Sequence, residues 1–173
     1  MENQPETTIV DLIRYNNWAN AQILTACQML TPSQFDASAP GTYGSIRATL
    51  EHIIQAEADY VGRLTGDHLQ PSFKWEDQPT LTDLSAFAVQ VAGALLDTFQ
   101  RIPLTYTVHE RECGNTLEYQ ARLLFIQVIN HGIEHRTNIT TILSGLDLPT
   151  PEVDGWGYLW SHQDQFEMKK GSQ

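Results

Sequence analysis

Residues 124–146 have the sequence LFIQVINHGIEHRTNITTILSGL. Apolar residues recur in this segment every three or four positions, which is the spacing of one face of an α-helix. The members of this apolar stripe are Leu124, Val128, Ile139, Ile142 and Leu146. His131 and His135 fill the remaining slots of the stripe. The segment therefore predicts a long helix that carries two imidazoles on its buried side.

The two histidines need partners, because burying an imidazole is costly unless its nitrogens are hydrogen-bonded or ligated. Positions i and i+4 place two Cβ atoms about 5–6 Å apart, so both rings can bind one metal ion at about 2.0–2.1 Å. His52 is the best candidate for a third ligand, since it borders the apolar stripe of another predicted helix and small Ala48 and Ala56 flank it. The predicted ligands are His52, His131 and His135. Three protein ligands leave a coordination position open, as in catalytic sites.

Two other interpretations of the histidine pair stay open at this point. The first is a pair of core histidines that are hydrogen-bonded within the protein. The second is a metallopeptidase, because residues 131–135 (HGIEH) match the H-x-x-E-H motif, in which Glu134 would be the general base. That activity also requires an acidic third ligand and a substrate cleft. We expect His68, His109 and His162, in a loop, a hairpin and the tail, to be exposed or locally hydrogen-bonded.

Three further long helices are predicted from apolar spacing and from capping residues. They are residues 7–30, capped by Thr7 or Thr8; 45–64, capped by Ser45 and followed by Gly66; and 80–101, capped by Thr80. Residues 104–119 favour strands around a turn, which predicts a short hairpin before the last long helix, 117–144. Gly145 is expected just past that helix, and a short helix with Trp156 follows. We expect an all-α fold, a four-helix bundle with long connections that forms one domain over residues 1–173.

The composition argues against several classes of function. A net charge of −11 disfavours a nucleic-acid partner and an anionic membrane surface, since both require a basic face. No apolar run approaches the roughly 20 residues that span a bilayer, and the acidic N-terminus does not resemble a signal peptide. We expect a cytoplasmic protein. Cys27 and Cys113 agree with a reducing compartment, and Cys27 is expected to be a small core residue.

Three blocks of the sequence match a known family in their order and spacing. They are residues 15–20 (YNNWAN), 44–53 (GSIRATLEHI) and 130–136 (NHGIEHR). Together with the predicted hairpin, they resemble the DinB/YfiT-like family over about residues 7–160. The resemblance implies an up-down-down-up four-helix bundle, often dimeric, in which one histidine of the second helix and two of the last bind a divalent metal. Those positions match His52, His131 and His135.

The resemblance also implies thiol chemistry, namely transfer or isomerisation reactions that use bacillithiol, mycothiol or glutathione. We therefore expect a metal-dependent thiol S-transferase that acts on a small electrophile, with a low-molecular-weight thiol as co-substrate. The cofactor would be one divalent ion, zinc, nickel, iron or manganese, because imidazole-rich sites accept several metals. A homodimer is expected by analogy. The alternatives are a metal-dependent hydrolase that uses metal-activated water, and a non-enzymatic metal-binding stress-response protein.

The chain departs from the common family pattern without losing a predicted ligand. Many relatives have histidine where Glu134 and Gln127 stand, and Gly-Gln where Thr137 and Asn138 stand. Gln127 and Asn138 share a helix face with the histidine pair, so these departures bear on the identity of the substrate.

Polar partners are expected behind the ligands, because metal-bound histidines usually donate their second ring N–H to a neighbour. The candidates are Asn16 and Asn20, which interrupt the apolar line of the first helix, and Glu51 and Asp59 on the second. The alternative for each asparagine is a hydrogen bond to a helix carbonyl.

Overall fold

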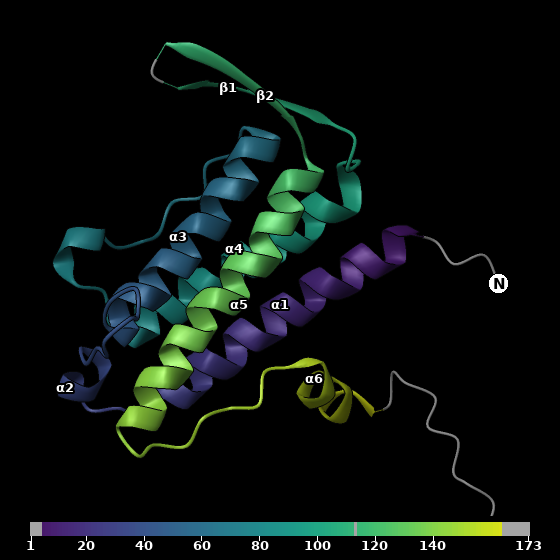
Figure 1. Cartoon of the computed structure of the whole chain (residues 1–173). Helices are drawn as coiled ribbons and strands as arrows, with labels where there is room; N and C mark the ends of the chain where they lie inside the picture. Colours follow the sequence, from purple (N-terminus) through teal and green to yellow (C-terminus); the bar gives the residue numbers. More distant parts are fainter. Residues whose placement is uncertain (1–4, 113, 164–173) are drawn as a thin grey trace, which may run out of the picture.

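The computed structural model describes residues 5–112 and 114–163 of the chain. Four long helices form a bundle, α1 (Pro5–Cys27), α3 (Ile46–Thr65), α4 (Leu81–Arg101) and α5 (Arg122–Gly145) (Figure 1). The shorter elements are α2 (Pro32–Phe35), the 3₁₀ turn η1 (Trp75–Asp77), the strands β1 (Thr107–Glu112) and β2 (Asn115–Gln120), and α6 (Gly155–Ser161). The prediction of an all-α fold with a small hairpin and a short C-terminal helix is confirmed.

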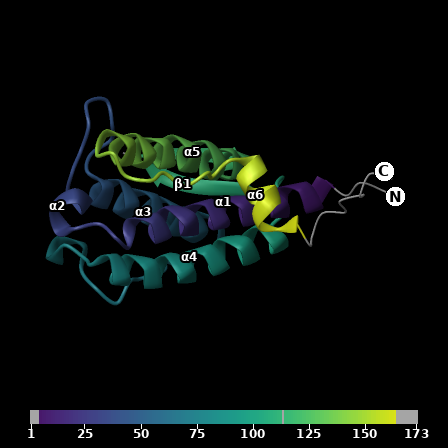
Figure 2. The same ribbon diagram turned by 90° about the horizontal axis from the view of Figure 1, so that it is seen from below.

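Two groups of buried side chains reveal the direction of each helix. One group joins the C-terminal halves of α1 and α5 to the N-terminal halves of α3 and α4; it includes Ile23, Ile139, Leu50 and Leu84. The other group joins the opposite halves; it includes Ile13, Leu124, Leu64 and Leu95. Helices α1 and α5 therefore run one way and α3 and α4 the other, which is the up-down-down-up order. The long connection between α3 and α4 returns the chain along the bundle (Figure 1). Figure 2 shows α4 and α5 on opposite sides of the pair formed by α1 and α3.

The predicted caps explain where two of the long helices begin. The Ser45 hydroxyl accepts a hydrogen bond from the Ala48 N–H at the start of α3. Thr80 and Asp83 form a capping box at the start of α4, in which each side chain bonds to the other's backbone. Gly66 ends α3 with φ of 81°, a left-handed conformation that glycine adopts without steric cost. These starts and ends are set by local sequence.

The prediction that the last long helix begins at Leu117 is wrong. Residues 117–120 belong to β2, where they pair antiparallel with β1; Leu117 lies opposite Glu110 and Gln120 opposite Thr107. This pairing satisfies their backbone groups, so α5 begins only at Arg122. At its other end Gly145 is the last helical residue, and Asp147 has the positive φ.

The first long helix was also predicted with wrong ends. It begins at Pro5, before the expected cap, since proline is well suited to the first turn of a helix. It ends at Cys27 instead of Leu30. Thr31 then caps the additional short helix α2 through a capping box with Gln34.

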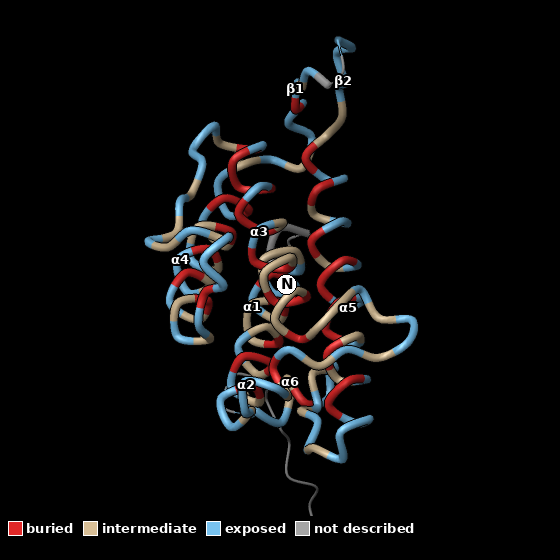
Figure 3. The backbone as a smooth tube through the Cα atoms, turned by 90° about the vertical axis from the view of Figure 1, so that its left-hand side faces the viewer, coloured by how far each residue is buried: buried red, intermediate tan, exposed pale blue. Residues whose placement is uncertain are grey.

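The buried side of α5 contains the predicted stripe, with both histidines in it, and Figure 3 shows this side facing the other helices. Leu146 is the exception, because it lies beyond the helix end and is 36% exposed. In the described part of the chain, no helix combines the length and the apolar character that crossing a membrane would require.

Candidate metal centre

Three histidines from two helices meet on the α5-facing side of α3. His52 comes from α3, and His131 and His135 come from successive turns of α5. One ring nitrogen from each lies within 4.8 Å of the others, and the Nε2 atoms of His52 and His131 are 2.9 Å apart. The structure thus brings the three predicted residues together.

On their Nδ1 side, the two histidines of α5 lack the hydrogen bonds to the protein that the core-histidine interpretation requires. The Nδ1 atoms of His131 and His135 are buried and have no hydrogen-bond partner among the described residues. Bonds of about 2.0–2.1 Å to one tetrahedral ion place ligand nitrogens about 3.3 Å apart, so small side-chain adjustments would close the set around an ion. These three histidines could hold a divalent metal ion.

The electrostatics keep the three imidazoles neutral, which is the form that binds metal. Burial lowers the pKa of all three rings. For His131 the pKa falls to about 4, and the neighbouring His135 and His52 add to the effect of burial because they disfavour a further positive charge.

Tyr43 covers the histidines from the loop before α3, and the sequence analysis did not identify it. Its ring stacks on His52 at 4.2 Å between centroids and meets the edge of His135 at 5.0 Å. The Tyr43 N–H donates a 2.6 Å hydrogen bond to Asn138 Oδ1 on α5, which ties the loop to the helix that carries two of the histidines. Tyr43 remains 54% exposed, so it shields one side of the centre without closing it.

Behind the histidines lies a buried polar network that links three helices. Glu57 Oε1 on α3 accepts hydrogen bonds from the amides of Asn16 and Asn20 on α1, at 2.7 and 2.8 Å. Arg136 Nη1 on α5 donates to the Oδ1 atoms of the same two asparagines, at 2.8 and 2.7 Å. The asparagines therefore bridge a buried carboxylate and a buried guanidinium.

This network corrects the prediction of polar partners behind the ligands. Asn16 and Asn20 bond to Glu57 and Arg136 and not to the histidines, and Asp59 pairs with Arg63. The sequence analysis missed Glu57, although an acidic residue one turn from Ile53 and Ile54 on a buried stripe is a signal for a satisfied core carboxylate.

Gly132 makes room for the network between the two histidines of α5. A Cβ atom at this position would lie 2.5 Å from Asn16 Oδ1 and 2.6 Å from Arg136 Nη1. A larger residue would therefore displace Asn16 and Arg136 and disturb the network at the level of the histidines.

The remaining candidates do not join the centre. Glu134 is exposed, and the three-histidine group contains no acidic ligand among the described residues, so the peptidase interpretation lacks its third ligand. His68, His109 and His162 lie outside the group. Cys27 is buried, and burial raises the pKa of its thiol to about 12, which agrees with a core residue and not a nucleophile. Cys113 lies outside the described residues.

The metal-free protein should lose stability as the pH falls from about 6.5 to about 4. The unfolded chain protonates histidine near 6.5, whereas the pKa of His131 in the folded protein is about 4, so the unfolded state binds the extra proton in this window. Urea unfolding at several pH values measures the slope. His131→Asn cannot titrate, and an unchanged slope in this variant would contradict the prediction.

Gly132→Ala should destabilise the fold by about 1–3 kcal/mol, because the added methyl overlaps Asn16 and Arg136. Gly93→Ala is the matched control, since the same methyl on α4 meets nothing within 4 Å and should stabilise the helix by about 0.5–1 kcal/mol. Denaturant unfolding compares the two. Equal effects would show that the space at Gly132 is not required.

Comparison with known proteins agrees with the three sequence blocks. A search of curated proteins found no match to the chain. The family model described as "DinB family" matches residues 1–168, a range that includes the hairpin, the network and all three histidines. The chain belongs to the DinB family.

Proposed function

We propose that the protein is a divalent-metal-dependent enzyme of the thiol S-transferase type, which joins a low-molecular-weight thiol to a small electrophile. The observation that carries the proposal is the convergence of three neutral imidazoles, with one ring nitrogen of each within 4.8 Å of the others. His52, His131 and His135 are the proposed ligands. The thiol preference rests on the family resemblance.

A divalent ion bound there would lower the pKa of a thiol at its open position, so that the thiolate nucleophile forms at neutral pH. The three histidines would hold the ion, and Tyr43 would shield one side of it from solvent. Three neutral imidazoles leave the charge of the ion uncompensated, which favours an anionic fourth ligand. Cys27, the one cysteine among the described residues, lies buried in the core between other side chains and does not compete for that role.

The polar side chains on the exposed part of α5 support the proposal of a small substrate beside the centre. Gln127 and Glu134 are exposed on α5, and Asn138 fixes the Tyr43 loop. The aromatic face of Tyr43 and these polar groups suit a small organic molecule. The net charge of −11 supports the further proposal that neither a nucleic acid nor an anionic membrane is the partner.

We extend the proposal to a cytoplasmic homodimer. Leu123, Ile126 and Ile133 on α5 are each about half exposed, and apolar patches of this kind are typical of association surfaces. Sedimentation of the purified protein tests the dimer, and a monomer at all concentrations would exclude it.

Substituting His52 and His135 together with alanine should abolish stoichiometric metal binding, because one ligand cannot hold a divalent ion against water. Elemental analysis of the purified variant measures the loss. His109→Ala is the matched control, since His109 pairs with Glu118 on the exposed hairpin and lies outside the centre. Full metal content in the double variant would disprove the ligand assignment.

The metal-loaded protein should consume a model electrophile only when a thiol is present. The assay uses a panel of bacillithiol, mycothiol, glutathione and cysteine with one chloro-dinitroaromatic substrate, and the double histidine variant should show only the uncatalysed rate. Turnover without any thiol would favour the hydrolase alternative. A protein that binds metal but catalyses neither reaction would support the non-enzymatic one.

A further inference from the structure

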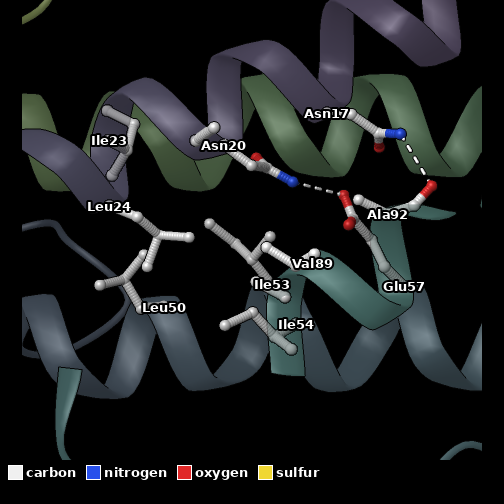
Figure 4. A pocket seen from close by; sticks show the side chains of 12 residues that line it. Asn17, Asn20, Ile23, Leu24, Leu50, Ile53, Ile54, Glu57, Val89 and Ala92 are labelled. Atoms are coloured by element: carbon white, nitrogen blue, oxygen red, sulfur yellow. Dashed lines mark hydrogen bonds between the residues drawn. The ribbon is translucent and has the colours of Figure 1, made fainter. Parts of the chain in front are cut away.

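A second polar feature of the bundle lies on the other side of α3, in a small cavity between α1, α3 and α4. The cavity has a volume of about 70 Å³. Figure 4 shows that Asn17, Asn20 and Glu57 gather toward one end, whereas aliphatic side chains such as Ile23, Leu24 and Leu50 surround the other. None of the three histidines lines it.

The polar end presents hydrogen-bond acceptors without matching donors. Both asparagine amides that reach Glu57 bond to Oε1, and no described residue donates to Oε2. Asn17 Nδ2 donates to the Ala92 carbonyl at 2.9 Å, which fixes the orientation of the amide because a carbonyl can only accept. Asn17 Oδ1 is left buried and without a partner. A ligand that carries several hydrogen-bond donors would satisfy both oxygen acceptors, Glu57 Oε2 and Asn17 Oδ1.

Glu57 adds a second requirement. Burial raises the pKa of its carboxyl group, whereas the two asparagine hydrogen bonds and the charge of Arg136 act to lower it, so the charged form depends on its partners. Its side chain is only 4% exposed, and a buried carboxylate is stable when a cation pairs with it. Arg136 is close, but its Nη1 donates to Asn16 and Asn20 and not to the carboxylate. Among the described residues Arg136 therefore acts on Glu57 through the asparagines and not by direct contact, and a positively charged ligand would add a cation that contacts the carboxylate itself.

We propose that this cavity binds a short primary alkylammonium ion. Its NH₃⁺ group donates to Glu57 Oε2 and Asn17 Oδ1, and its alkyl chain packs against Leu24, Leu50 and Ile53 at the aliphatic end. Size agrees with this class: a cavity of about 150 Å³ holds the six carbons of benzene, so about 70 Å³ suits about three or four non-hydrogen atoms.

The residues that line the cavity also bear on how a ligand enters it and on which other ligands could bind there. Val89 also lines the cavity and is 74% exposed, so the cavity reaches the surface beside α4, and the acidic surface attracts cations. An alcohol has one donor for two acceptors, and its own lone pairs would find no donor among Asn17 and Glu57 as they are oriented. A water molecule could satisfy the polar end but leaves the aliphatic end empty.

Methyl NMR of the full-length protein tests the proposal, with n-propylammonium as the probe and n-propanol and tetramethylammonium as comparisons. Propylammonium should produce saturable shifts of the Ile23, Leu24 and Ile53 methyl groups, with a dissociation constant on the order of millimolar. Propanol should bind at least tenfold more weakly, and tetramethylammonium, which has no N–H donor, should not bind. No saturable shift with propylammonium, or equal binding of propanol, would overturn the proposal.

Two variants separate recognition of charge from occupation of space. Glu57→Gln keeps the shape of the side chain but removes its charge, and should weaken propylammonium binding at least tenfold. Ala88→Leu places a larger side chain in the lining of the cavity and should abolish binding, whereas Ala86→Leu, on the exposed side of the same helix, should leave it unchanged. Circular dichroism confirms that each variant is folded. Wild-type affinity in both Glu57→Gln and Ala88→Leu would overturn the proposal.

Discussion

The buried carboxylate of Glu57 is the constraint on which the arrangement of the bundle depends. An unpaired carboxylate in a core is so costly that the fold is favourable only where Asn16 and Asn20 reach it, and those amides are in turn oriented by Arg136. The four side chains come from α1, α3 and α5, so one relative placement of these three helices joins them in a single hydrogen-bonded network. Gly132 supplies the space that this placement needs.

The same placement brings the histidines together. Glu57 lies five residues after His52 on α3, and Arg136 directly follows His135 on α5. A helix slip that broke the network would also separate the ring nitrogens of His52 and His131, which are 2.9 Å apart. The polar network therefore supports the three histidines. Tyr43, whose N–H donates to Asn138 on α5, covers them from the loop on the side where the proposed substrate would bind.

Helix α3 separates two environments of opposite character. Its α5-facing side presents His52 to a group of neutral imidazoles, which lack charge and suit a cation with an open position. Its other side presents Glu57 to a small cavity of acceptors and aliphatic groups. The two sites share the network between them, since Asn20 and Glu57 line the cavity and bond within the network. The proposed metal site and the proposed ammonium site thus lie on either side of one buried polar cluster.

The sequence by itself determined the features that depend on neighbours within a helical turn or two. The apolar stripe of α5, the caps Ser45 and Thr80, and the histidines at i and i+4 follow from periodicity and local hydrogen bonding, and His52 followed from its small neighbours. Only the tertiary structure decided what depends on partners far along the chain. Residues 117–120 form a strand because β1 pairs with them. Asn16 and Asn20 donate hydrogen bonds to Glu57 because α1 and α3 pack together. Tyr43 stacks on His52 because its loop folds back over α5. These contacts cannot be predicted from one segment of the sequence, because they form only when the helices are packed.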